Sequence, residues 1–399
     1  MVILVVAGAI VWQASPARHT ESVQATGTPA EILPAAMVPE TFTARWHAAS
    51  AATGTPAVAR SAIITADGST VIGRDPTTGS PRWRYSRDTP LCTAAAAWRG
   101  SVNEVLAVYR NSRGCSEVTA LDADTGARKG ARTSDADGTL HLVTDSGYVL
   151  AQGPDRLETW GSNLVRGIEY GRVTAPVNPG VQPTRTDCHL YSSAISGDRL
   201  SVIERCAGDP GYRLTVLGAL LDSNEHVNQY GSSLITDRAS ATPPVLIAMS
   251  SSGIAVYDGG ANGSSPAHPT IRLFNSDGAP EQTSKVEGSP APPTGSTAIT
   301  SDGLVTFYTG TATVILDAQS LQAKYQIPEM LGPGEAMGGQ LLIPYAEGIS
   351  VRNAASGARI RDIRLTRHDY TGGLVSLRVL GDSVIEQRGG LIEVYGPPT

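Results

Sequence analysis

A ten-residue phrase that returns along the chain constrains the fold more than any other feature. LDADTGARKG at 121–130 has close counterparts in RDPTTGSPRW at 74–83 and RNAASGARIR at 352–361, and a weaker one in LDAQSLQAKY at 316–325. An Asp or Asn at the first turn position can accept hydrogen bonds from the backbone N–H groups of the turn, and a Gly four residues later can adopt the left-handed conformation. The phrase therefore predicts a hairpin turn between two strands.

The predicted turns run from Asp75 to Gly79, from Asp122 to Gly126 and from Asn353 to Gly357, and Asp317 begins the weaker copy. A second turn signal, usually containing Gly, precedes each by one strand length, as in ADGST at 66–70, SRGCS at 112–116 and AEGIS at 346–350. A strand, a turn, a strand, an Asp turn and another strand make an antiparallel meander. Gly (43) and Pro (26) are frequent and charged residues are only 17% of the chain, which favours strands and turns over surface helices.

The spacing of the turns predicts an all-β, eight-bladed β-propeller. With anchors at Asp75, Asp122, Pro154, Asp222, Asn275, Asp317, Asn353 and Tyr395, the span of 320 residues over seven intervals gives about 46 residues each. Repeats of this length with about four short strands are typical of propeller blades. Seven blades are the alternative if the weakly marked unit around Asp222 is misread.

The two ends of the chain predict how the ring closes. GGLIEVYGPPT at 389–399 supplies the strand that leads into a turn, but the chain stops before the fourth strand. TFTARWHA at 41–48 precedes the first complete unit and resembles the outer strand SPRWRYS. We expect this N-terminal strand to complete the C-terminal blade, because that removes two sheet edges and locks the ring.

The four cysteines predict an oxidising compartment. Cys92 and Cys115 are 23 residues apart and Cys188 and Cys206 are 18 apart, and neither pair has a CxxC or CxxH metal spacing. Two local disulfides are the simplest pairing. The alternative is four buried free thiols in a cytoplasmic protein.

The N-terminal residues predict a membrane attachment. Residues 1–12 are apolar but too short to cross a bilayer as a helix, so we expect 1–14 to be part of a transmembrane anchor that begins upstream, with a short apolar core strand as the alternative. Residues 15–40 are expected to be a Pro/Ala/Thr-rich linker and 41–399 the propeller. This predicts a single-pass protein of the cell membrane with the propeller on the extracytoplasmic side.

The turn phrases carry a family resemblance. STVIGRDPTTGSPRWRY and SEVTALDADTGARKG resemble the blade repeat of the pyrroloquinoline quinone (PQQ) enzyme-like propellers, most closely those that are membrane-anchored in actinobacteria. The similarity is good in the first two blades and poor between 153 and 290. The resemblance implies a propeller fold. It does not imply one function, because the family includes quinoprotein dehydrogenases as well as envelope scaffolds.

An enzymatic role has little support in the residues. The quinoproteins implied by the resemblance clamp their cofactor with adjacent cysteines, and this chain has none, so no cofactor and no metal are expected. The seven histidines show no HxH or HxxxH spacing, and HDY at 368–370 is expected on a loop between blades. Asp122 and Asp317 are expected as turn acceptors, and Trp83 and Trp160 as seals between blades.

The remaining candidates for a functional site are surface loops. Pro/Gly/Ser-rich insertions at 172–187, 258–270 and 286–297 could be binding loops or tolerated insertions without function. The net charge of -6 without a basic stripe excludes a nucleic-acid partner on electrostatic grounds. We therefore expect a non-enzymatic scaffold that binds a protein partner of the cell envelope. The alternative is a degenerate quinoprotein-type enzyme or a ligand sensor that uses the central funnel.

Overall fold

The repeated turn forms as expected and connects the third and fourth strands of a blade. In the computed structural model, which describes residues 16–27, 29–173, 182–183, 185, 187–236, 242–260 and 268–398, Asp75 Oδ1 accepts the backbone N–H groups of Thr77 and Thr78, both at 2.9 Å. The Gly79 N–H donates to the Asp75 carbonyl at 2.9 Å, and Gly79 has a φ of 72°. A positive φ of this size explains why Gly occupies the closing position.

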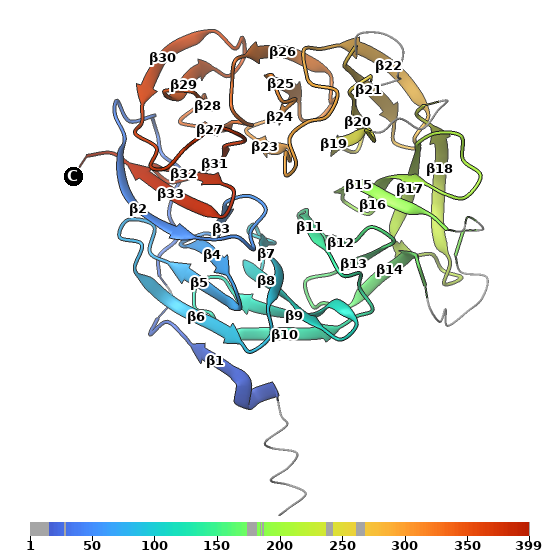
Figure 1. Cartoon of the computed structure of the whole chain (residues 1–399), viewed down its shortest axis with the longest axis horizontal. Helices are drawn as coiled ribbons and strands as arrows, with labels where there is room; N and C mark the ends of the chain where they lie inside the picture. Colours follow the sequence, from blue (N-terminus) through green and yellow to red (C-terminus); the bar gives the residue numbers. More distant parts are fainter. Residues whose placement is uncertain are drawn as a thin grey trace, which may run out of the picture.

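Eight antiparallel sheets are arranged in a ring around a central axis (Figure 1). Blade 1 has the order β1-β6-β5-β4-β3, and blades 2 to 7 are four-stranded meanders in sequence order. The unit around Asp222 is a complete blade, so the chain has eight blades rather than seven. The fold class predicted from the sequence is confirmed.

The first four blades have the following strands. Blade 1 contains β1 (Thr20–Val23), which follows the 3-10 turn η1 (Pro16–His19), with β3 (Ala57–Val58), β4 (Ile63–Asp67), β5 (Thr70–Arg74) and β6 (Pro81–Arg87); blade 2 contains β7 (Leu91–Ala97), β8 (Glu104–Asn111), β9 (Gly114–Asp122) and β10 (Arg128–Thr133); blade 3 contains β11 (His141–Thr144), β12 (Val149–Gln152), β13 (Arg156–Trp160) and β14 (Arg166–Gly171); blade 4 contains β15 (His189–Ser196), β16 (Arg199–Arg205), β17 (Arg213–Leu221) and β18 (Val227–Leu234).

The remaining four blades follow the same plan. Blade 5 contains β19 (Val245–Met249), β20 (Gly253–Asp258), β21 (Thr270–Asn275) and β22 (Pro280–Lys285); blade 6 contains β23 (Ile299–Ser301), β24 (Leu304–Tyr308), β25 (Ala312–Asp317) and β26 (Ala323–Pro328); blade 7 contains β27 (Glu335–Met337), β28 (Gln340–Tyr345), β29 (Gly348–Asn353) and β30 (Arg359–Arg364); blade 8 contains β31 (Ser376–Leu380), β32 (Ser383–Arg388), β33 (Leu391–Gly396) and β2 (Thr43–Ala49).

The N-terminal strand closes the ring as predicted. β2 pairs antiparallel with β33, from Thr43 opposite Gly396 to Ala49 opposite Leu391. Blade 8 therefore takes its outer strand from the start of the chain and its three inner strands from the end.

Aromatic side chains seal some neighbouring blades together. The Trp83 indole, on the outer strand of blade 1, is 1% exposed and donates to the Ala123 carbonyl of blade 2 at 2.9 Å. A Cβ at Gly126, in the turn of blade 2, would lie only 2.7 Å from Trp83 Cγ, so the ring packs directly on this glycine. The same arrangement recurs where Trp46 packs on Gly79 and where Tyr325 packs on Gly357.

Two other interfaces use the reverse arrangement. At the position of the turn glycine, blade 6 has Leu321 with a φ of 58° and blade 3 has Leu164 with a φ of 59°, and both are buried. The facing outer strand then has no large aromatic side chain: a Cβ at Gly130 would lie 3.5 Å from Leu164 Cδ1. A large side chain on the outer strand of one blade thus faces a glycine in the turn of the next blade, and a small residue on the outer strand faces a leucine in that turn.

One predicted turn anchor, Pro154, is wrong. Pro154 lies in the turn between β12 and β13, whereas the turn between the third and fourth strands of blade 3 follows Trp160. The reason is that Leu164 replaces the glycine there, so the Asp-Gly phrase is missing. Trp160 itself is 1% exposed and packs with blade 2 residues such as Leu106 and Val108, which confirms it as a seal between blades.

Part of the segment expected to be a linker lies against the propeller. β1 adds a fifth strand to the outer edge of blade 1, with Val23 opposite Arg84 (Figure 1). Residues 29–40, which we call the strap, then cross three blades: the Ile32 N–H donates to the Arg60 carbonyl at 3.0 Å. Further along, Arg361 donates to the carbonyls of Val38 and Pro39, both at 3.0 Å. The expected anchor at 1–14 lies outside the described residues.

The two faces of the ring differ. Turns between first and second strands and between third and fourth strands lie on one face, which we call the turn face, and the strap lies on it beside Arg60, Gly338 and Gly381. All other connections begin and end on the opposite face, which we call the loop face. The insertions at 172–187, 258–270 and 286–297 therefore all belong to the loop face, although the first two lie largely outside the described residues.

Candidate functional site

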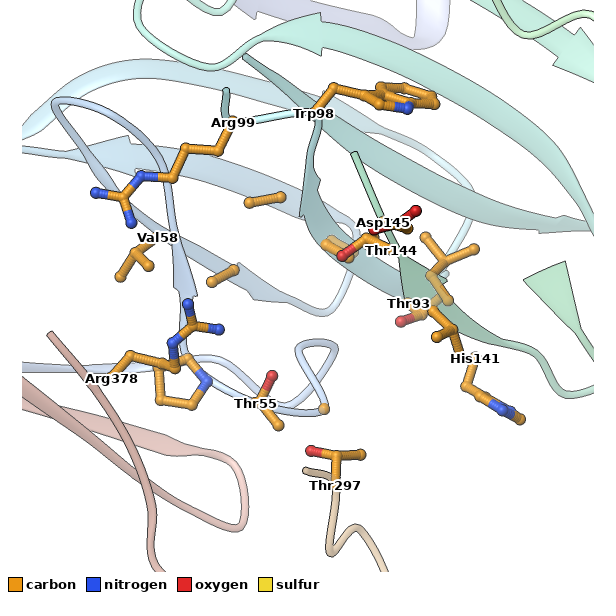
Figure 2. Close-up of a pocket in the computed structure, with 18 of the residues that line it drawn as sticks. Thr55, Val58, Thr93, Trp98, Arg99, His141, Thr144, Asp145, Thr297 and Arg378 are labelled. Carbon is orange, nitrogen blue, oxygen red and sulfur yellow. The ribbon is translucent and has the colours of Figure 1, made fainter. Parts of the chain in front are cut away.

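A cavity of about 620 Å³ opens in the centre of the ring (Figure 2). Its walls come mainly from the inner strands β3, β7, β11 and β31, which belong to blades 1, 2, 3 and 8. β7 has the sequence LCTAAAA, and its alanines leave room along the axis. The cavity has the size of pockets that bind small molecules.

Two arginines lie on one side of this cavity. Figure 2 shows the guanidinium groups of Arg99 and Arg378 on either side of Val58. Arg378 forms an ion pair with Glu335 at 2.9 Å. The same carboxylate also accepts a hydrogen bond from the Val379 N–H at 2.6 Å. Within the described part of the chain, the Arg99 guanidinium donates no hydrogen bond.

The surroundings of Arg99 make its charge costly. Burial lowers the pKa of Arg99, and the positive charges of Arg378 and Arg60 lower it further, while Glu335 and Glu31 act in the opposite direction. Its backbone is held in place because Arg60 Nε donates to the Arg99 carbonyl at 2.7 Å. The chain therefore positions Arg99, which has no ion-pair partner in the described ranges, near the like charge of Arg378.

The other walls of the cavity combine small apolar side chains, such as Ala94 and Val143, with several hydroxyl groups. Thr55, Thr93, Thr144 and Thr297 contribute hydroxyl groups that have no hydrogen-bond partner in the described ranges, and Figure 2 shows them below and across from the two guanidinium groups. Asp145 is already engaged, since its Oδ2 accepts the Gly197 N–H at 2.8 Å.

The loop face carries a second group of charged residues at blade 8. Arg367 pairs with Glu386 through two contacts of 2.7 and 2.8 Å, and both side chains are almost fully buried. Arg388 bridges Glu386 at 3.2 Å and also pairs with Glu393. Each carboxylate is thus neutralised by an arginine, an arrangement that stabilises the loop before β31 against the blade.

The sequence HDY at 368–370 lies beside this group, on the connection between β30 and β31, as expected for a loop between blades. These residues line a cavity of about 580 Å³ together with Pro293 and Thr294 of the 286–297 insertion. His368 Nε2 lies 3.9 Å from Glu393 Oε1, which is beyond hydrogen-bonding distance.

The predicted cysteine pairs form disulfides. Cys92 is bonded to Cys115 within blade 2 and Cys188 to Cys206 within blade 4, so the alternative of four free thiols is wrong. Cys188, Glu204 and Cys206 lie close together, but both sulfurs are in the disulfide and offer no thiolate to a metal.

The predicted turn residues are distributed around the ring, one turn to a blade, and do not form one site. The turn aspartates and the turn asparagine all accept N–H groups of their own turns, as seen for Asp75, Asp122, Asp317 and Asn353. Burial opposes ionisation of Asp122, but hydrogen bonds from Thr125 and the charge of Lys129 outweigh it and lower the pKa of this carboxyl.

No sequence pattern pointed to Arg99 or Arg378 as site residues. They lie 279 positions apart, on blades 2 and 8, and meet only because the ring closes. Neither belongs to the repeated phrase, and no spacing rule could have connected them.

Comparison with known proteins supports the fold alone. No family model matches the chain, and no curated protein matches it. Among solved structures, the dihydro-heme d1 dehydrogenase NirN in complex with DHE is 12% identical with a TM-score of 0.54, covering 88% of this chain and 78% of that one. The Neurospora crassa Pan2 WD40 domain is 12% identical with a TM-score of 0.46, covering 78% of this chain and 90% of that one.

Proposed function

We propose that the chain is a non-enzymatic, membrane-anchored propeller on the extracytoplasmic side of the cell membrane, where it binds a protein partner of the cell envelope. The observation that carries the proposal is the asymmetry of the ring. Three Pro/Gly/Ser-rich insertions belong to the loop face, while the turn face carries short turns and the strap. Loops displayed on one side of a rigid scaffold are common sites of recognition.

The compartment is supported by the disulfides. Cys92–Cys115 and Cys188–Cys206 would be reduced in a cytosol but persist in an oxidising environment. Among the described residues, no helix has the length and hydrophobicity needed to span a bilayer. The anchor therefore rests on the apolar composition of residues 1–12. Alkaline phosphatase fused after residue 399 should be active in the native cell, since it folds only outside a reducing cytosol; an inactive fusion would place the propeller inside.

The relation to the PQQ enzyme-like propellers is also part of the proposal. It rests on the Asp-x-x-Thr-Gly turns at Asp75 and Asp122 and on Trp83, which follow the repeat of that family. Within that group we propose a scaffold rather than an enzyme, because arginines hold the buried carboxylates Glu386 and Glu393 of blade 8 in ion pairs.

Photo-crosslinking from each face tests the binding proposal. A photoreactive amino acid replaces Ala291, an exposed residue of the loop face, in the full chain expressed in its native cell. Ala355 is the matched control, because it is also an exposed alanine but lies in a turn of blade 7 on the turn face. We expect a defined protein adduct from position 291 and none from 355.

The outcomes separate the possibilities. The same adduct from 355 and none from 291 would show that the turn face binds the partner. The absence of any adduct from 291, from a second loop-face position at Thr294 and from 355 would contradict the scaffold proposal, provided that the variants are produced at the normal level.

A further inference from the structure

The central cavity has the features of a ligand site whose occupant is anionic. We propose that it binds a small organic oxyanion, with a carboxylate or phosphate group at Arg99 and Arg378 and with hydroxyl groups, as in a sugar acid or a sugar phosphate, against the threonines of the opposite walls. This inference is independent of the protein partner proposed above.

The cations define the charge of the ligand. A guanidinium group has five N–H donors in a planar fork that matches carboxylate and phosphate oxygens. Arg99 uses none of these donors on the described protein, and Arg378 shares its one carboxylate partner, Glu335, with the Val379 N–H. Since the two guanidinium groups repel each other, an oxyanion on this side of the cavity removes that cost and fills the empty donor positions.

The size and the remaining walls define the rest of the ligand. A cavity of about 620 Å³ is much larger than an inorganic anion needs and suits an organic molecule. The hydroxyl groups of Thr55, Thr93, Thr144 and Thr297 can each donate and accept a hydrogen bond, and the alanines of β7 line the same cavity without adding charge. Neutral hydroxyl partners favour a hydroxylated ligand over an apolar one.

The strap supplies a competitor for the anion. Glu31 acts on Arg99 with a charge opposite to that of Arg378, and the strap is attached near this position, because Ile32 bonds to Arg60. A carboxylate near the empty donors partly neutralises Arg99 when no ligand is bound. Removing that charge should therefore tighten binding of an anion.

Calorimetric titration of the full chain tests the proposal with four probes: glucose 6-phosphate, glucuronate, inorganic phosphate and glucose. We expect the two hydroxylated anions to bind, inorganic phosphate to bind more weakly and to compete with them, and glucose not to bind. Arg99→Gln should weaken both anions by about tenfold or more, which is the loss expected for a charged hydrogen bond. Glu31→Gln should tighten them by about two- to threefold.

Matched variants separate a lost site from a damaged fold. Arg364→Gln removes the same charge at a highly exposed position on blade 7 and should leave binding unchanged. Thr93→Val should weaken glucuronate but leave inorganic phosphate unaffected. All variants should keep the melting temperature of the parent within a few degrees, because the Arg99 side chain makes no hydrogen bond to any residue that the structure describes.

Three results would overturn the inference. Failure of both hydroxylated anions to bind at millimolar concentration means that the cavity has no such ligand. Equal binding by the Arg99→Gln and Arg364→Gln variants means that the anion binds elsewhere. Equal affinity for inorganic phosphate and glucose 6-phosphate would remove the role given to the threonines.

Discussion

Replacing the turn glycine under Trp83 should destabilise the propeller more than replacing a glycine with the same backbone conformation in open space. At Gly126 the φ is 72° and a Cβ would lie 2.7 to 2.8 Å from Trp83, which is itself buried. At Gly68 the φ is 58° but nothing lies within 4 Å. Gly126→Ala therefore suffers both backbone strain and overpacking, whereas Gly68→Ala suffers strain alone.

The magnitudes follow from these two contributions. A left-handed alanine costs about 1 kcal/mol, and an extra methyl group in a packed interface costs about 1–3 kcal/mol, so Gly126→Ala should lose about 2–4 kcal/mol. With an unfolding entropy of about 2.1 cal/mol/K per residue, a chain of this length changes its melting temperature by roughly 1 °C per 0.8 kcal/mol. We expect a decrease of about 2–5 °C for Gly126→Ala and about 1 °C for Gly68→Ala.

Differential scanning calorimetry on the two variants and the parent measures the difference. A melting temperature for Gly126→Ala no lower than that for Gly68→Ala would refute the idea that the Trp83 ring and the turn glycine determine each other. Intrinsic fluorescence of the variant should also change, because a displaced Trp83 becomes exposed to water.

Three further predictions concern the interface, the disulfide and the turn carboxylate. Combining Trp83→Gly with Gly126→Leu, the arrangement seen at blades 2 and 3, should recover part of the stability that Gly126→Leu alone loses; a double variant less stable than both single variants would contradict this in the same calorimetric assay. Replacing both Cys92 and Cys115 by serine should cost about 3 kcal/mol, or about 4 °C, and reducing agent should no longer affect blade 2. The lowered pKa of Asp122 means that its contribution is present above pH about 4 and is lost as the pH falls below that value, so Asp122→Asn should show a smaller drop in melting temperature between pH 5 and pH 3 than the parent.

The sequence predicted those parts of the fold that depend on local turn chemistry. Asp75 and Gly79 predict a turn because the hydrogen bonds and backbone conformation of that turn involve only its own residues. The repetition of the turn along the chain was then enough to predict the blades and the closure of the ring. The turn at Leu164 was not predicted because it has leucine in place of the usual glycine. The space for that leucine side chain is provided by Gly130 of the neighbouring blade.

The candidate site and the strap could not be predicted in the same way. Arg99 and Arg378 come from blades 2 and 8, and their proximity depends on the radius of the closed ring rather than on any local pattern. The strap appears in the sequence as a Pro/Ala/Thr-rich spacer, yet its Val38 is buried between blades 7 and 8, as is Phe42 just after it. Its attachment depends on single contacts spread along the chain, such as Arg361 with the Val38 carbonyl.

The closing strand also determines the order in which the molecule can mature. Thr43 and Gly396 are partners in one sheet but are 353 positions apart, so β2 has no partner when it leaves the ribosome or a secretion channel. Blades 1 to 7 can stack one on another as they emerge, but blade 8 cannot form until β33 arrives. During that interval the β2 edge is exposed and can pair wrongly with another chain, so a chaperone that shields the N-terminal strand would help this protein most.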